Sequence, residues 1–305
     1  MAKSAPSGPI LITGSSSGIG RSSALALHAA GRTVYATARR LDSIKDLADQ
    51  GIRTLALDVT DEESMTTAVA AIEAESGPIA VLINNAGYGL YGAVEQVPMD
   101  DIRRQFETNF FGLVRLTQLV LPGMRQARQG RILNVSSMGG RVTLPGGAFY
   151  HASKYAVEAF SDALRMEVAQ FGIDVVLIEP GPVKTPWNDV AAGSMDGNGA
   201  AEASAGAAEA SAGAAEASAG AADDPYAAYK KAVAGSFTTV QDGPLGRLAS
   251  TADDIAEVIV KAVTAGTPRT RYLINAVAKS MLATRRLLPT RASDALLARQ
   301  YGLPR

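Results

Sequence analysis

The chain has 305 residues, of which 47% are hydrophobic and 19% charged, and 29 basic against 30 acidic residues give a formal net charge of −1. This balance argues against nucleic-acid binding, which depends on clustered Lys and Arg that neutralise phosphates. The chain has no Cys, which excludes disulfides and thiolate chemistry, and its two histidines, His28 and His151, are too far apart in sequence to suggest a metal site.

The sequence predicts no segment for membrane insertion or export. No apolar run approaches the roughly 18 residues that a membrane-spanning helix needs. Met1 to Pro9 also lack the apolar block of a secretory signal. We therefore expect a cytoplasmic protein.

Strand patterns and helix patterns alternate along most of the chain. Strands are predicted at 10–12, 33–39, 53–59, 79–83, 131–135 and 173–178. Helices are predicted after the first strand as far as Gly31 and at 41–50, 61–76, 100–127, 150–171 and 251–265, the last opened by a Thr-x-x-Asp cap at Thr251. Strands separated by helices form right-handed βαβ units, so we expect an α/β fold with a parallel sheet covered on both faces.

Residues 200–220 break this alternation. They are three copies of Ala-Ala-Glu-Ala-Ser-Ala-Gly, a seven-residue period without the large apolar residues that coiled-coil helices bury. The Gly in each copy costs a helix about 1 kcal/mol. We interpret residues 193–224 as a low-complexity insertion, which a folded domain tolerates because loop-closure entropy grows slowly with length. A partner-binding segment is the alternative.

The C-terminal segment, residues 267–305, is basic. It holds eight Lys and Arg and one acid, Asp294, so its charge of +7 leaves −8 for the rest of the chain. Its leucines and methionine suit an amphipathic helix that contacts anionic lipid or another subunit. A solvated basic face on a packing helix is the alternative.

A glycine-rich turn follows the first strand. Gly14, Gly18 and Gly20 have the spacing Gly-x3-Gly-x-Gly, and a helix begins behind them. Such a turn lets the backbone approach a pyrophosphate, whose charge the helix N-terminus stabilises. The spacing differs from G-x-G-x-x-G, and no Gly-Lys-Ser/Thr follows, which excludes a Walker loop. The turn therefore predicts a dinucleotide site, with an ordinary turn as the alternative.

Two arginines, Arg39 and Arg40, end the second strand in place of an acid. Dinucleotide folds that prefer NAD place an acid there for the adenosine ribose, whereas a nearby Arg accommodates the 2′-phosphate of NADP. The pair therefore predicts NADP(H) in preference to NAD(H). Surface arginines that bind nothing are the alternative.

Tyr150 and Lys154 stand four residues apart on a predicted helix and so share one face. An ammonium group beside a phenol stabilises the phenolate and lowers its pKa from about 10. The phenol can then exchange a proton with an alcohol or a ketone. A packed phenol beside a solvated lysine is the alternative.

Taken together in this order, the motifs resemble those of the short-chain dehydrogenase/reductase family. Thr13–Gly20 matches the family's Thr-Gly-x-x-x-Gly-Ile-Gly fingerprint, Asn84–Gly87 its Asn-Asn-Ala-Gly motif, and Pro180-Gly181 with Thr185 its nicotinamide-side motif. The resemblance is strong over about residues 8–190. It implies a single Rossmann-type, doubly wound domain over residues 1–305 and a homodimer or homotetramer.

The resemblance implies roles for four catalytic residues. Tyr150 would exchange the proton with the substrate oxygen, and Lys154 would lower the pKa of Tyr150 and hold the nicotinamide ribose. Ser137, with neighbouring Ser136 as its competitor, would hydrogen-bond the developing alkoxide. Asn109 would anchor a water that links Lys154 to solvent. Hydride would pass directly between nicotinamide and substrate, so no metal is implied. His151 is expected to pack or to face solvent.

The same motifs give the expected cofactor contacts. Asp58 and Val59 would flank the adenine, and Thr185 would face the carboxamide. The predicted cofactor-binding residues are Gly14, Ser16, Ser17, Gly18, Ile19, Gly20, Arg39, Arg40, Asp58, Val59, Asn85, Ala86, Gly87, Tyr150, Lys154, Pro180, Gly181, Val183 and Thr185.

Within the family, the segments 84–92, 179–185 and 287–291 resemble members related to 17β-hydroxysteroid and retinol dehydrogenases. This implies a small lipophilic carbonyl or alcohol substrate. The candidate pocket residues are Tyr88, Leu90, Leu144, Phe149 and Trp187, with ordinary core packing as the alternative. We therefore expect an NADP(H)-dependent reductase or dehydrogenase. The alternative is a non-catalytic NADP(H)-binding sensor or scaffold that acts through the insertion and the basic C-terminal segment.

Overall fold

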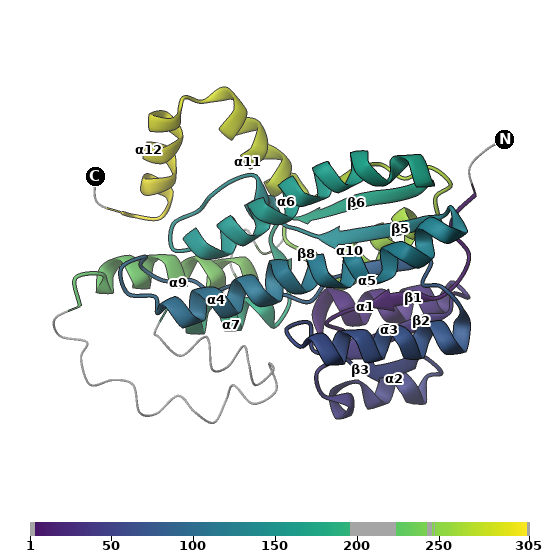
Figure 1. Ribbon diagram of the computed structural model, residues 1–305. Helices are drawn as coiled ribbons and strands as arrows, with labels where there is room; N and C mark the ends of the chain where they lie inside the picture. The colour runs from purple at the N-terminus through teal and green to yellow at the C-terminus, as the bar shows by residue number, and fades with distance from the viewer. Residues whose placement is uncertain (1–3, 196–223, 243–245, 247, 304–305) are drawn as a thin grey trace.

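The computed structural model describes residues 4–195, 224–242, 246 and 248–303, and seven parallel strands form its central sheet (Figure 1). The strands are β1 Ile10–Ile12, β2 Val34–Ala38, β3 Arg53–Ala56, β4 Val81–Asn84, β5 Gly130–Val135, β6 Ile173–Pro180 and β9 Arg271–Ile274. Their order is β3-β2-β1-β4-β5-β6-β9, so the winding reverses between β1 and β4. This is the doubly wound arrangement, and the predicted α/β fold is confirmed.

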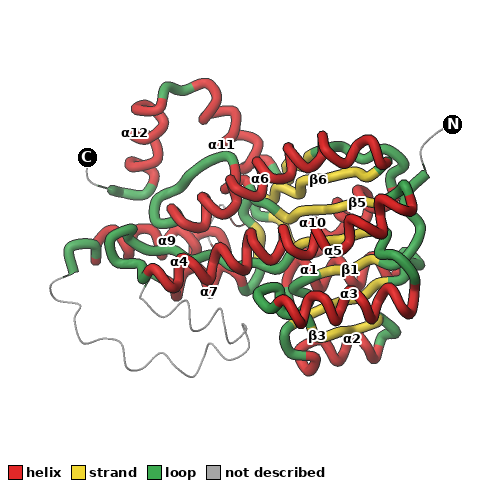
Figure 2. The backbone as a smooth tube through the Cα atoms, in the orientation of Figure 1, coloured by secondary structure: helices red, strands yellow, loops and turns green. Residues whose placement is uncertain are grey.

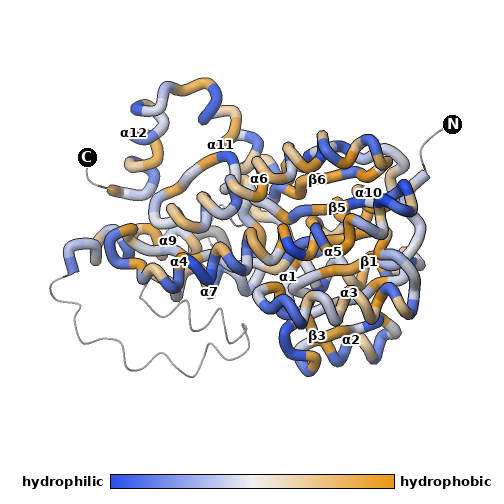
Figure 3. Tube along the Cα trace, in the orientation of Figure 1, coloured by the Kyte–Doolittle hydropathy of each residue, from blue (hydrophilic) through white to orange (hydrophobic). Residues whose placement is uncertain are grey.

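Helices cover both faces of the sheet (Figure 2). On one face lie α1 Gly18–Ala29 and α10 Ala252–Thr264, and on the other lie α3 Glu62–Ser76, α5 Gly112–Ala127 and α6 Ala148–Val168. The side chains of successive strand residues point to opposite faces of the sheet: Ile10 and Ile12 pack toward α1 and α10, and Leu11 packs toward α3 and α5. All three side chains are fully buried, which is why β1 is apolar at every position. Figure 3 shows the hydrophobic strands enclosed by the helices.

A second group of helices lies beyond the carboxyl ends of the strands, at the left of Figure 1. It comprises α4 Met99–Phe106, α7 Trp187–Ser194, α9 Ala227–Asp242, α11 Ala276–Leu287 and α12 Thr290–Gln300. Beneath these helices, the short strands β7 Val183–Lys184 and β8 Ser250–Thr251 pair in parallel. The helices therefore surround the edge of the sheet at which a doubly wound fold binds its ligands.

Two predicted helices differ in detail from those observed. The helix predicted at 100–127 contains a π-helical turn, η2 Glu107–Phe111, between α4 and α5. The helix predicted at 41–50 begins as a 3₁₀ turn, η1 Leu41–Ile44, before α2 Lys45–Asp49. The capping box predicted at Thr251 is confirmed, because Thr251 and Asp254 exchange side-chain and backbone hydrogen bonds.

The structure describes most of the basic C-terminal segment but little of the predicted low-complexity insertion. Gly193 and Ser194 of the predicted insertion belong to α7, and the three repeats lie outside the described residues. The basic C-terminal segment contributes β9, α11 and α12, so part of it completes the sheet. Among the helices that the structure describes, none combines the length and apolar character needed to cross a membrane.

Candidate active site

A cavity of about 890 Å³ opens at the carboxyl ends of the strands. Loops that follow β1, β2, β3, β4, β5 and β6 all reach it. The predicted site residues that line it are Gly14, Ser16, Ser17, Gly18, Ile19, Arg39, Asp58, Val59, Asn85, Ala86, Gly87, Ser137, Tyr150, Lys154, Pro180, Gly181, Val183 and Thr185. The cavity wall does not include Gly20, Arg40 or Asn109. The fold thus brings together nearly all of the residues predicted from the motifs.

The turn after β1 has the shape of a phosphate-binding loop. Gly14 and Gly18 have φ values of 70° and 54°, in the left-handed region that favours glycine. A Cβ atom on Gly20 would lie 2.3 Å from the Gly14 carbonyl oxygen, so Gly20 lets α1 pack against the turn instead of lining the cavity. The side chain of Asn85 donates to the same carbonyl at 3.1 Å. The N-terminus of α1 therefore faces the cavity, where it fits the pyrophosphate of a dinucleotide.

The far end of the cavity suits an adenosine group. Arg39 follows β2, and Asp58 and Val59 follow β3, all on the cavity wall. The Asp58 carboxylate accepts from the backbone and the hydroxyl of Thr60 at 2.9 and 2.7 Å, which fixes this corner. Arg40, predicted as a second phosphate contact, is exposed and lies off the wall. Arg104 of α4, which no motif marked, lies on it.

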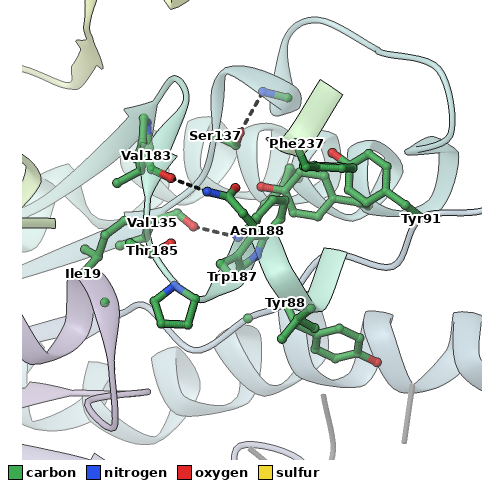
Figure 4. Close-up of a pocket in the computed structure, with 18 of the residues that line it drawn as sticks. Ile19, Tyr88, Tyr91, Val135, Ser137, Val183, Thr185, Trp187, Asn188 and Phe237 are labelled. Atoms are coloured by element: carbon green, nitrogen blue, oxygen red, sulfur yellow. Dashed lines mark hydrogen bonds between the residues drawn. The ribbon is translucent and has the colours of Figure 1, made fainter. Parts of the chain in front are cut away.

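Tyr150 and Ser137 meet at the other end. Both side chains line the cavity, and the Ser137 hydroxyl accepts from the backbone N–H of Gly139 at 2.9 Å (Figure 4). Burial raises the pKa of Tyr150 to about 12, and the nearby Ser137 hydroxyl only partly opposes this. The sequence predicted a lowered pKa, which is wrong for this structure because the loss of solvation outweighs any stabilisation of the phenolate. Tyr150 is therefore protonated at neutral pH.

Lys154 lies one helical turn after Tyr150. Its ammonium group donates to the backbone carbonyl of Val135 at 2.9 Å (Figure 4), and its side chain is buried. Burial lowers the pKa of Lys154 to about 8, although the charge of Glu158 acts in the opposite direction. A Cβ atom on Gly87 would lie 3.6 Å from the Lys154 Nζ. The ammonium thus lies beside the loop predicted to hold the nicotinamide half of the cofactor.

Asn109 lies behind the cavity, within the π-helical turn η2. Its side-chain oxygen accepts from the backbone N–H of Tyr88 at 3.0 Å. Its amide nitrogen donates to the Tyr88 carbonyl at 2.9 Å and to the Ser153 hydroxyl at 3.1 Å. These bonds tie the loop after β4 to α6, a structural role that the sequence prediction did not include.

Aromatic side chains cover Tyr150. The ring centroids of Trp187 and Tyr91 lie 5.1 and 5.8 Å from that of Tyr150, and Phe237 lies 4.9 Å from Tyr91. Figure 4 shows Trp187, Tyr91 and Phe237 as one group, with Tyr88 pointing away from it. Leu144, Val233, Met281 and Tyr301 also line the cavity.

Two of the residues predicted to line the pocket do not line it. Leu90 is buried elsewhere, with 4% of its surface exposed, and Phe149 lies off the cavity wall. Tyr91 and Phe237 take their place. Tyr91 directly follows Leu90 in the segment 84–92, and only the fold shows that the Tyr91 side chain, rather than that of Leu90, lines the cavity.

Comparisons with known proteins agree with this fold. Residues 9–194 match the family model described as short chain dehydrogenase. The chain is 34% identical to the probable short-chain type dehydrogenase/reductase VdlC of Helicobacter pylori over 94% of this chain and 95% of that protein. It is 46% identical to the 3-ketodihydrosphingosine reductase of Bacteroides thetaiotaomicron over 59% of this chain and 65% of that protein.

Among solved structures, serine dehydrogenase complexed with NADP+ resembles this chain with a TM-score of 0.70 and 26% identity, over 88% of this chain and 95% of that one. The chain belongs to the short-chain dehydrogenase/reductase family.

Proposed function

We propose that this protein is an NADP(H)-dependent oxidoreductase that transfers hydride between nicotinamide and the carbon of a carbonyl or alcohol group. The observation that carries the proposal is that Tyr150, Ser137 and Lys154 line one end of a cavity whose wall also includes a glycine turn at the N-terminus of α1. A bound nicotinamide would supply or accept the hydride. Every other step falls to side chains of this chain.

The residues at the reacting end have complementary tasks in this proposal. Tyr150, protonated at neutral pH, donates a proton to the oxygen of a ketone as it is reduced. Ser137 donates a hydrogen bond to the same oxygen, where negative charge grows in the transition state. Lys154 holds the nicotinamide ribose and supplies a positive charge beside the site. The loop residues 85–87 line the cavity and would contact the cofactor.

We assign NADP(H) as the preferred cofactor because Arg39 stands on the cavity wall where an acid would select NAD. The similarity to a serine dehydrogenase that was solved with NADP+ supports this choice. Arg39→Asp should lower kcat/KM for NADPH at least tenfold and raise it for NADH. A wild-type enzyme with higher kcat/KM for NADH would contradict the assignment.

We also propose a lipophilic substrate. The aromatic and aliphatic wall around Tyr150 supports this, since apolar walls with few polar groups suit apolar ligands. The likeness to a 3-ketodihydrosphingosine reductase is consistent with it. A panel of long-chain ketones, steroids, retinoids and short aldehydes, assayed with both cofactors, tests the class. Short aldehydes as the best substrates would overturn it.

The decisive test of the reaction is Tyr150→Phe. Removal of the proton donor should reduce NADPH oxidation with a ketone by about a hundredfold or more while NADPH still binds. Tyr226→Phe is the matched control, because the Tyr226 hydroxyl bonds Glu95 at the surface, away from the cavity. Unchanged turnover in Tyr150→Phe would refute the assigned donor. NADPH binding without turnover of any carbonyl in the wild-type protein would favour the sensor alternative.

We further propose a cytoplasmic protein that touches membranes through the basic C-terminal segment. Leu287, at the end of α11, is 82% exposed and follows Arg285 and Arg286 directly. Exposed leucine beside arginines suits an anionic lipid surface. The wild-type protein should sediment with phosphatidylglycerol vesicles, and a variant with Arg285→Glu and Arg286→Glu should not. Failure of the wild type to sediment would remove this proposal.

A homodimer or homotetramer also remains our proposal. Phe111 is 50% exposed, and Tyr155 and Met166 on α6 are 41% and 75% exposed. Large apolar side chains at such positions favour a subunit contact. Light scattering of the wild type and of Met166→Glu tests it: the wild type should have at least twice the monomer mass, and a monomeric wild type would contradict the proposal.

A further inference from the structure

The second histidine lies directly behind the proposed active site. His151 follows Tyr150 on α6 and is 2% exposed, on the wall of the same cavity. Its Nδ1 atom lies 2.9 Å from the backbone carbonyl oxygen of Gly139. A carbonyl oxygen can only accept, so the proton of the neutral ring must be on Nδ1. Burial lowers the pKa of His151 to about 4, which keeps the ring neutral at physiological pH.

The backbone of Gly139 connects this histidine to Ser137 through two consecutive peptide groups. Its carbonyl accepts from His151, and its N–H donates to the Ser137 hydroxyl oxygen at 2.9 Å. That bond occupies one acceptor position of the Ser137 oxygen. The hydroxyl proton of Ser137 is not used in that bond and can be donated into the cavity that Ser137 lines, where the proposed reaction needs a donor.

The short turn η3 Met138–Gly140 lies flat against α6, and glycine is required for this. A Cβ atom on Gly139 would lie 2.6 Å from the His151 Nδ1, and one on Gly140 would lie 2.8 Å from the Glu158 Cγ and 3.0 Å from the Lys154 carbonyl oxygen. Among the hydrogen bonds of the described residues, the His151 Nδ1 is the side-chain donor to the Gly139 carbonyl. The His151 ring therefore ties the turn, and with it Ser137, to α6, in addition to the backbone hydrogen bonds within the turn.

We propose that His151 is a positioning residue that orients the Ser137 hydroxyl through the backbone of Gly139. It touches neither cofactor nor substrate in this role. His151 directly follows Tyr150 on α6. The same stretch of backbone therefore positions the Tyr150 phenol and, through η3, the Ser137 hydroxyl, and both groups act on the substrate oxygen in the proposed reaction. The inference rests on the proposed function, in which Ser137 stabilises the developing alkoxide.

Two substitutions separate the hydrogen bond from the bulk of the ring. His151→Leu keeps a side chain of similar size without a donor, whereas His151→Asn offers an amide N–H at nearly the position of Nδ1. We expect kcat for ketone reduction to fall about tenfold in His151→Leu, with the KM for NADPH unchanged, and to recover to within about threefold of wild type in His151→Asn. Thermal unfolding of both variants separates loss of fold from loss of orientation.

The tautomer can be read in the wild-type protein without any substrate. The chain has two histidines, so labelling with ¹⁵N-histidine gives four ring nitrogen signals, which His28→Gln assigns. We expect a protonated Nδ1 and a bare Nε2 for His151 at pH 7. A proton on Nε2, or equal kcat values in wild type and His151→Leu, would overturn the proposal, as would equal losses in His151→Leu and His151→Asn. If the wild type reduces no ketone, the proposed function fails, and the tautomer still decides whether His151 holds Gly139.

Discussion

The indole of Trp187, at the start of α7, lies against the phenol of Tyr150, with ring centroids 5.1 Å apart and ring planes inclined by 58°. Trp187 is the single tryptophan of the chain. Its fluorescence therefore reports on the reacting end of the cavity and on no other part of the molecule.

Titration with NADPH should quench the emission of Trp187, because the indole lines the cavity in which the dihydronicotinamide is proposed to lie. The quenching should saturate at the same NADPH concentration as heat release in calorimetry. A variant with Trp187→Phe should bind NADPH and show no signal above the tyrosine background. Binding seen by calorimetry without any change in the emission of the wild type would place the cofactor elsewhere.

Gly89→Ala should move the same indole. A Cβ atom on Gly89 would lie 2.4 Å from the Trp187 Cζ2, closer than real Cβ atoms approach any neighbour. Overpacking of this kind costs about 1–3 kcal/mol of unfolding free energy. We expect a destabilised variant with shifted Trp187 emission, partly rescued by adding Trp187→Phe, which leaves room for the methyl group. Additive effects of the two substitutions in chemical denaturation would argue against direct contact.

The pH dependence of kcat/KM for NADPH should follow Lys154. Burial lowers the pKa of this ammonium to about 8, so it is charged below that pH and neutral above it. Because the neutral amine attracts the anionic cofactor less, kcat/KM should fall as the pH rises, to about one tenth of its pH 7 value at pH 9. The measurement requires constant ionic strength. A flat profile to pH 9.5 would show that Lys154 keeps its charge.

Arg271→Met should destabilise the fold strongly. Arg271 on β9 pairs with Glu158 at 3.1 Å, Asp162 at 2.7 Å and Glu179 at 2.9 Å, and the Glu179 side chain is fully buried. Removing one partner of a buried ion pair costs about 3–5 kcal/mol. We expect a loss near the lower end of this range, because Glu179 keeps its pair with Arg141 at 3.0 Å while Glu158 loses Arg271. Arg103→Met is the control, since its pair with Asp100 is exposed and should contribute less than about 1 kcal/mol. Equal denaturation midpoints for the two variants would contradict this.

Much of the fold and of the site follows from local sequence. The fully buried strand β1 has an apolar residue at every position, and the glycines at 14, 18 and 20 are required by backbone geometry that admits few other residues. Such constraints act within a few residues of the chain. For this reason the parallel sheet, the glycine turn and the relation between Tyr150 and Lys154 on one helix were predictable.

The features that were missed depend on contacts between distant segments. Phe237 reaches Tyr91 only because α9 folds over the cavity, and β9 pairs with β6 across about ninety intervening residues. The raised pKa of Tyr150 has the same origin, because burial by α7 and α9 is a tertiary effect that spacing along α6 does not reveal. The position of Lys154 one helical turn after Tyr150 was predictable from the sequence, whereas the loss of solvent around the Tyr150 phenol was not.

The π-helical turn η2 makes the number of residues between α4 and α5 critical. An α-helix advances about 100° per residue, so deleting one residue from Glu107–Phe111 would restore regular winding and rotate α4 by that angle relative to α5. Gln105, which donates to the Tyr88 carbonyl at 3.2 Å, would then swing off the loop after β4. Most surface segments accept a change of length. Here the loss of a single residue would separate α4 from the loop after β4, which lines the cavity. Related chains that retain the cavity should therefore retain the additional residue of the π-helical turn as well.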